Sequence, residues 1–133
     1  LGILFSIGIP VYTNNINKAK ITKAIADIHA ISQDLLAYMV DHEKLPESLA
    51  DIGKQSAFDP WGSPYQYLKI EGEDDGPIEN CRKDRFDVPL NSDFDLYSMG
   101  KNKRSQPSLS EKDSGDDIVR ANNGGYIGLA SRY

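Results

Sequence analysis

The sequence is poor in the residues that carry most covalent and metal chemistry. Its 133 residues include one cysteine, Cys81, and two histidines, His29 and His42. A single cysteine excludes an intramolecular disulfide, and there is no CxxC motif or Cys/His cluster for a zinc site or a Cys–His nucleophile pair. Both histidines fall in one predicted helix, and we interpret them as ordinary helix residues.

The chain also lacks a surplus of positive charge. Its 15 Lys and Arg residues are outnumbered by 20 Asp and Glu residues, which gives a formal net charge of -5 and a pI of about 4.9. Nucleic-acid binding depends on clustered Lys and Arg that displace counterions from phosphates. We therefore expect no nucleic-acid partner.

Catalytic constellations are missing as well. There is no glycine-rich phosphate loop and no nucleophile–base pair. Neighbouring aspartates that are capable of acid–base work fall in predicted turns or at strand ends, where Asp is common for structural reasons. These pairs are Asp74/Asp75, Asp93/Asp95 and Asp116/Asp117. We predict that the protein is not an enzyme.

The uncharged run LGILFSIGIPVY, residues 1–12, is too short to cross a bilayer, which takes about 20 apolar residues. It also lacks the basic n-region of a signal peptide. Two interpretations remain, a buried helix or the C-terminal part of a longer membrane segment. We favour the second, because nothing polar precedes the run. Such an apolar segment must be buried in a membrane or against copies of itself.

Residues 13–42 change to an amphipathic pattern, with apolar side chains at spacings of three and four. The stripe consists of Ile21, Ile25, Ile28, Ile31, Leu35 and Tyr38 or Met39. We predict a long helix over residues 1–42 and a globular β-sheet domain with loops over residues 43–133. A lysine cluster follows the apolar run and suits either a phosphate-rich surface or a plain solvated face; it comprises Lys18, Lys20 and Lys23.

The sequence after residue 42 predicts short strands and turns. PESLADIG predicts a short helix with Pro46 early in it and Gly53 as its stop. DPWG, residues 59–62, predicts a tight turn, and alternation predicts strands over residues 64–69, 93–100 and 126–130. A polar loop without periodicity separates the last two strands. The fold class is α+β, with one long helix packed on a small antiparallel sheet.

Two motifs, in order, carry a family resemblance. FDPWGSPYQYL contains DPWG-x-PY, and DFDLYSMG contains D-x-DLYS-x-G. With the apolar start LGILFSIGIPVYTNNINKAKITKA they resemble the type IV pilin superfamily and, within it, the major pseudopilins of type II secretion systems. The resemblance covers residues 1–70 and 93–118. The helix alone indicates only the superfamily, whereas the ordered pair of motifs is specific.

The resemblance implies a pilin-like fold and a function. Such proteins are cleaved by a prepilin peptidase, methylated, held in the inner membrane by the N-terminal helix with the globular domain in the periplasm, and assembled into a homopolymeric filament. In the secretion system, with its other components, the filament drives export of folded proteins. The peptidase site, the first helical turns and the family's glutamate are not in this sequence. Residues 78–91 are longer and more charged than the resemblance leads us to expect.

Calcium is also implied by the resemblance. The family holds the loop after the second strand with calcium in place of a C-terminal disulfide, and a single cysteine agrees with that. The ligands fall on the backbone carbonyl of Met99 and on Asn102, Asp116 and Asp117. The family has an acid where this chain has Asn102, whose amide oxygen can ligate but brings no charge. We therefore predict a calcium site of reduced affinity.

Other filament functions share this architecture. A type IV pilus pilin for adhesion or motility, or a minor pilin acting as a binding module, remains the alternative. A binding module would be expected to carry a larger C-terminal domain than residues 43–133. Genes for a secretion ATPase and a secretin nearby would favour the pseudopilin. A soluble calcium-binding module is a third class, and it predicts a monomer that leaves membranes alone.

Overall fold

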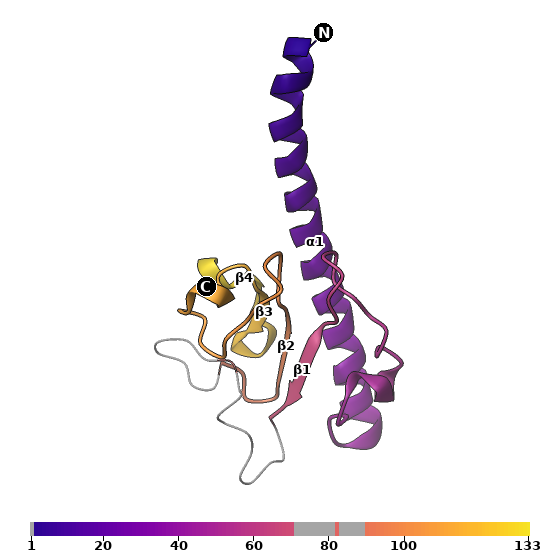
Figure 1. Ribbon diagram of the computed structural model, residues 1–133. Coiled ribbons are helices and arrows are strands. Elements are labelled where there is room, and N and C mark those ends of the chain that lie inside the picture. Colours follow the sequence, from indigo (N-terminus) through magenta and orange to yellow (C-terminus); the bar gives the residue numbers. More distant parts are fainter. Residues whose placement is uncertain (1, 71–81, 83–89) are drawn as a thin grey trace.

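One long helix and a small sheet make up the protein in the computed structural model, which describes residues 2–70, 82 and 90–133, with the helix side chains described from Ile16 onward. Helix α1 spans Gly2–His42, so the predicted helix end is confirmed. The sheet lies beside the C-terminal half of α1, and the N-terminal half projects beyond the globular part (Figure 1). Among the described residues, no helix combines the length and apolar character that a membrane crossing needs.

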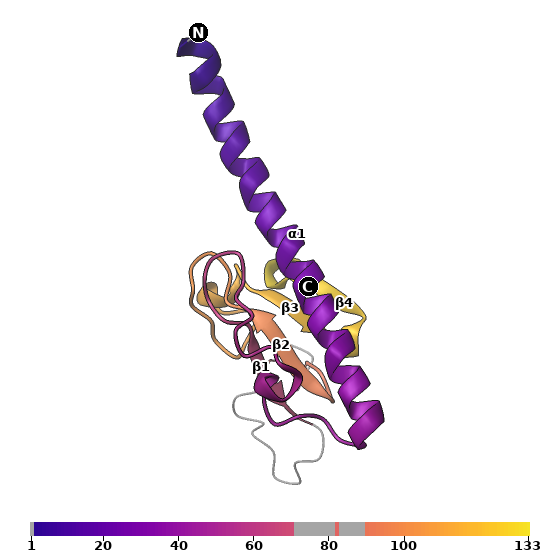
Figure 2. The same ribbon diagram turned by 90° about the vertical axis from the view of Figure 1, so that its right-hand side faces the viewer.

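The sheet has four antiparallel strands in the order β1-β2-β3-β4. These are β1 (Gln66–Lys69), β2 (Phe94–Ser98), β3 (Ile118–Ala121) and β4 (Tyr126–Leu129). Helix α1 packs on one face, against β2, β3 and β4 (Figure 2). The predicted α+β layout is confirmed, and three predicted strands are found in place with shorter bounds.

Strand β3 was not predicted from the sequence. It has only four residues, includes a charged one and is flanked by polar pairs, so neither alternation nor an apolar run marks it. Arg120 is nevertheless 2% exposed. Its guanidinium donates two 2.8 Å hydrogen bonds to the Asp93 carboxylate and lies 3.9 Å from the centre of the Phe94 ring. A pairing distant in sequence makes this charge compatible with a buried strand.

The predicted short helix at PESLADIG is corrected. The structure has a 3-10 turn, η1, over Leu49–Ile52, and Pro46 lies before it rather than within it. Pro46 is buried, and its carbonyl accepts a 2.6 Å hydrogen bond from the Tyr67 hydroxyl. That hydrogen bond attaches the chain at Pro46 to strand β1, which contains Tyr67. Gly53 ends the turn as predicted, with φ 72.

The amphipathic stripe of α1 forms one wall of the core. Ile28 and Leu35 are fully buried and Ile31 is nearly so, in one cluster with residues of β2 and β3. Ile21, Ile25 and Met39 pack against the same cluster with partial exposure. Each fully buried aliphatic side chain contributes about 1.5–3 kcal/mol relative to an exposed one. The described part of α1 is therefore held to the sheet mainly by this stripe.

Candidate functional site

The turn that starts the first motif is organised by one carboxylate. Asp59 Oδ1 accepts the backbone N–H groups of Trp61 at 3.1 Å and Ser63 at 2.9 Å. The Gly62 N–H donates to the Asp59 carbonyl at 3.0 Å, and Gly62 has φ 90. Glycine tolerates that conformation without steric cost. The turn predicted at residues 59–62 is confirmed, and the side chain of its first residue, Asp59, accepts the backbone N–H groups that follow.

The same carboxylate joins the two motifs. The Ser98 hydroxyl, at the end of β2, donates to Asp59 Oδ2 at 2.7 Å, and Ser98 Oγ accepts the Gly100 N–H at 3.0 Å. Asp59 is 4% exposed and Ser98 is fully buried. DPWG and DLYS, far apart in sequence, are thus two sides of one buried contact, which we call the motif corner (Asp59, Trp61, Ser63, Ser98 and Gly100).

Two tyrosines dock the first motif on the helical part. The Tyr65 hydroxyl donates to Asp27 Oδ2 on α1 at 2.7 Å, and Tyr67 reaches the Pro46 carbonyl. Burial, followed by nearby carboxylates, raises the pKa of both hydroxyls. Trp61 packs with partial exposure against the core cluster that includes α1. The interpretation of FDPWGSPYQYL as a corner between helix and sheet is confirmed, although Tyr65 precedes β1 rather than beginning it.

The loop after β2, residues 99–117, brings Asp116 near its end back to Gly100 in the motif corner. Gly100 has φ +70, and a Cβ placed there would lie 2.0 Å from the Asp116 carbonyl oxygen. Only glycine allows the two ends of the loop to approach so closely. Asn102 bridges within the loop: its Nδ2 donates to the Asp113 carbonyl at 2.9 Å, and its Oδ1 accepts the Arg104 N–H at 3.0 Å.

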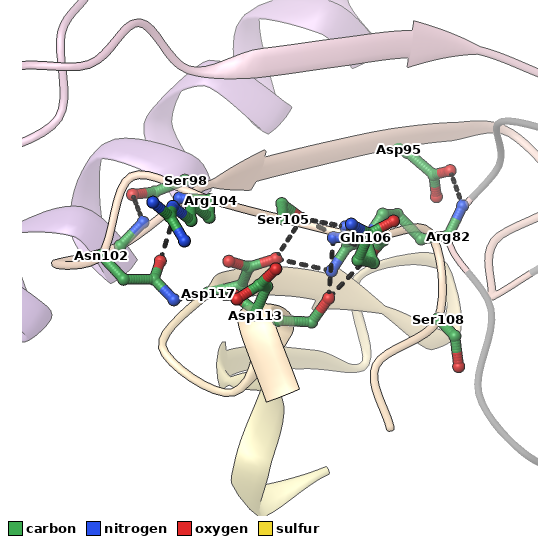
Figure 3. A network of polar contacts seen from close by, with 12 residues as sticks. Arg82, Asp95, Ser98, Asn102, Arg104, Ser105, Gln106, Ser108, Asp113 and Asp117 are labelled. Carbon is green, nitrogen blue, oxygen red and sulfur yellow. Dashed lines mark hydrogen bonds and ion pairs between the residues drawn. The ribbon is translucent and has the colours of Figure 1, made fainter. Parts of the chain in front are cut away.

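Asp117 is the buried charge of this loop. Its side chain has no exposed surface. Asp117 Oδ2 accepts hydrogen bonds from Arg82 at 2.7 Å and from the Ser105 hydroxyl at 2.5 Å (Figure 3). Burial raises the pKa of Asp117 to about 6, although the bonds from Ser105 and Arg82 act to lower it. The carboxylate is therefore held in a site where its charge is costly without a cation.

Arg82 supplies that cation. Its side chain is 2% exposed, and its guanidinium also donates to Ser105 Oγ and to the Gln106 carbonyl, the latter at 2.6 Å. The guanidinium carbon lies 4.3 Å from the centre of the Tyr97 ring. Sequence reasoning missed this residue because it lies in the charged segment 78–91, to which no structural signal was assigned. Of that segment only Arg82, Leu90 and Asn91 are described; Cys81 is not.

Of the predicted calcium ligands, the side chains of Asn102, Asp116 and Asp117 do not form a set of free oxygens. Asp116 is exposed, whereas Asp117 is buried and paired with Arg82. Asn102 uses both ends of its amide within the loop. In the described part of the chain, no three His, Cys, Asp or Glu side chains form a group able to hold a metal ion. The residues fit a calcium ion poorly, and calcium stays a prediction.

Three of the aspartates considered for catalysis, Asp93, Asp95 and Asp117, have structural partners, whereas Asp116 is exposed. Asp93 pairs with Arg120. Asp95 accepts the Arg82 backbone N–H at 2.6 Å and the Asn91 amide at 2.9 Å, and burial raises its pKa. Asp74 and Asp75 lie outside the described residues. That the protein is not an enzyme stays a prediction.

Two curated proteins that share one name are similar to this chain. The type II secretion system core protein G of Pseudomonas aeruginosa is 28% identical over 137 aligned residues, 87% of this chain and 84% of that protein. Core protein G of Aeromonas hydrophila is 34% identical over 89 residues, 51% of this chain and 62% of that protein. No protein-family profile and no solved structure matches the chain. The resemblance predicted from the two motifs is confirmed.

Proposed function

We propose, because the chain is a relative of type II secretion core protein G, that it is a major pseudopilin: a structural subunit of a helical filament that drives protein export. The observation that carries the proposal is the motif corner. The two sequence motifs that carry the family resemblance meet in the structure through the bond between Ser98 and Asp59. In this chain that contact is buried and joins the first motif to the end of β2. Both similar proteins are named as parts of a secretion system rather than of a pilus.

The arrangement of helix and sheet suits a filament subunit. Helix α1 has 41 residues, about 60 Å at 1.5 Å per residue. The globular part lies on its C-terminal half only, which leaves the projecting half available to copies of the chain (Figure 1). Residues 1–12 of that half carry no charge. Exposed to water, such a surface would be unfavourable, and packing it against copies or lipid removes the cost.

Assembly and location follow from this. Before assembly the apolar start of α1 would lie in the inner membrane, with the globular domain in the periplasm. After assembly the same segment, residues 3–12, would form the filament core, while other secretion components act on the fibre. The side chains of residues 1–15 lie outside the described part of the structure, so this proposal rests on their sequence and on the course of α1.

An aspartate placed in the apolar start tests the proposal. Ile7→Asp puts a charge in the expected core, and burying an unpaired charge costs several kcal/mol per subunit, repeated along the fibre. We expect filaments to be lost while the globular domain keeps its thermal transition. Val40→Asp is the matched control, because Val40 is 77% exposed on the same helix. Normal filaments from Ile7→Asp, seen by negative-stain microscopy, would contradict the proposal.

A further inference from the structure

We infer that Arg82 is a built-in cation that clamps the loop after β2 and takes the place that a bound divalent ion would have. The clamp consists of Arg82, Ser105, Gln106 and Asp117, with Tyr97 beneath it. It gives a role to Arg82, which the filament function leaves unexplained. The inference rests on these contacts and stands whether or not the chain forms filaments.

The main chain of Arg82 is anchored to the sheet. Its N–H donates to Asp95 Oδ2 on β2 at 2.6 Å, and its carbonyl accepts the Leu90 N–H at 2.8 Å. Asp95 is itself 1% exposed and accepts a second bond from Asn91. The backbone from which the guanidinium extends is therefore fixed by buried hydrogen bonds, and the side chain starts from a defined position.

The guanidinium lies among the oxygen types that bind hard cations. It contacts a carboxylate oxygen of Asp117, the hydroxyl of Ser105 and the carbonyl of Gln106 (Figure 3). Carboxylate and carbonyl oxygens are also the usual ligands of calcium. A guanidinium presents up to five N–H donors in a plane and keeps its charge at any physiological pH. It can therefore tie the loop to the sheet without a metal.

Charge balance favours a single positive charge at this place. Asp117 is the one fully buried carboxylate among the predicted ligands, and Arg82 supplies one buried positive charge. Asn102 is neutral, and Asp116 is exposed. A divalent ion beside Asp117 would bring two more positive charges against the guanidinium, and like charges in a poorly solvated site repel strongly. The donor set suits one guanidinium better than one calcium ion.

Two buried atoms of the clamp have no hydrogen-bond partner, one from each member of the ion pair. Asp117 Oδ1 and Arg82 Nε are both buried without a hydrogen bond. The ion pair uses one N–H donor and one carboxylate oxygen, so each partner retains capacity for a second bond. A metal ion that used this spare oxygen would share the Asp117 carboxylate with the guanidinium, so the effect of calcium and EDTA on the stability of the chain distinguishes the two cations.

The test measures the thermal transition of the full chain in mild detergent, followed by the fluorescence of its single tryptophan, Trp61. The wild-type melting temperature should be the same in excess EDTA and in excess calcium. Arg82→Met should lower it by roughly 10 °C, because it leaves a buried carboxylate unpaired. Arg104→Met removes an exposed guanidinium from the same loop and should change it little.

A second variant isolates the ion pair. Adding Asp117→Asn to Arg82→Met removes the unpaired charge and should recover part of the lost melting temperature. Limited subtilisin digestion should cut residues 101–117 roughly tenfold faster in Arg82→Met than in wild type, with or without EDTA. If Arg82→Met does not fold, Arg82→Lys gives the same comparison with the charge retained and the planar fork lost.

Three results would overturn the inference. A wild-type transition or digestion rate that responds to EDTA would show that a metal holds the loop. An Arg82→Met transition equal to that of Arg104→Met would show that the buried guanidinium does not. No recovery on adding Asp117→Asn would show that the effect of Arg82 does not act through that carboxylate.

Discussion

Replacing Asp59 by alanine should remove the hydrogen bonds that hold the motif corner together and lower the free energy of unfolding. The side chain accepts three hydrogen bonds, from Trp61 and Ser63 through Oδ1 and from Ser98 through Oδ2. With only 4% of the residue exposed, water cannot easily replace the lost carboxylate. Alanine would leave the buried Ser98 hydroxyl without its acceptor and the turn N–H groups without their cap.

The magnitude follows from these bonds. A hydrogen bond to a charged group contributes about 1.5–3 kcal/mol net when buried. Two of the three are buried and the one from Trp61 is partly exposed, so we expect a loss of roughly 4 kcal/mol. For a chain of this length that corresponds to a fall in melting temperature of about 12 °C. Ser98→Ala removes only the link between the motifs and should cost about 2 kcal/mol.

A double-mutant cycle is the assay. Chemical denaturation of wild type, Asp59→Ala, Ser98→Ala and the double variant gives the coupling between the two side chains. We expect a coupling of about 1.5 kcal/mol, because the double variant removes both partners of one buried bond. Additivity within about 0.5 kcal/mol would mean that the motifs do not stabilise each other, and the reasoning on the motif corner would be refuted.

Two further substitutions test neighbouring features. Gly100→Ala should cost at least about 2 kcal/mol and speed proteolysis of the loop, because its new Cβ would meet the Asp116 carbonyl at 2.0 Å in a left-handed conformation; an unchanged denaturation midpoint would contradict the close approach. Tyr65→Phe should cost about 1 kcal/mol by removing the bond to Asp27, without changing the fold seen by circular dichroism. A loss below the error of the denaturation curve would show that this contact does not dock the corner on α1.

Local patterns in the sequence predicted the elements that depend on neighbouring residues. The apolar stripe predicted α1 to its end at His42, and the DPWG turn followed from Pro60 and Gly62. Alternation placed β1, β2 and β4 to within a few residues. These signals are periodic or steric, and they act over a few residues of chain.

What escaped prediction depends on pairs far apart in sequence. The buried Arg120 of β3 is paired with Asp93, and the buried Asp117 is paired with Arg82. A charged residue is expected to be exposed when only the sequence is known, because its spacing along the chain does not reveal a distant partner. The calcium prediction came from a family resemblance, which gave expected ligand positions in the loop and stays untested. A resemblance confined to that loop could not indicate that Arg82, from another segment, pairs with Asp117.

The division of the chain into a helix over residues 1–42 and a domain over residues 43–133 stays a prediction. So does the apolar filament core at residues 3–12, because it concerns side chains outside the described part of the structure. The assembly of Ile7→Asp tests the predicted filament core.

Electron microscopy of the membrane-processed protein, produced together with its secretion apparatus and labelled by an antibody to this chain, tests the central claim most directly. The account predicts labelled helical fibres built from many copies of the chain. A labelled protein that stays monomeric and unattached to membranes at the same level of production would contradict it.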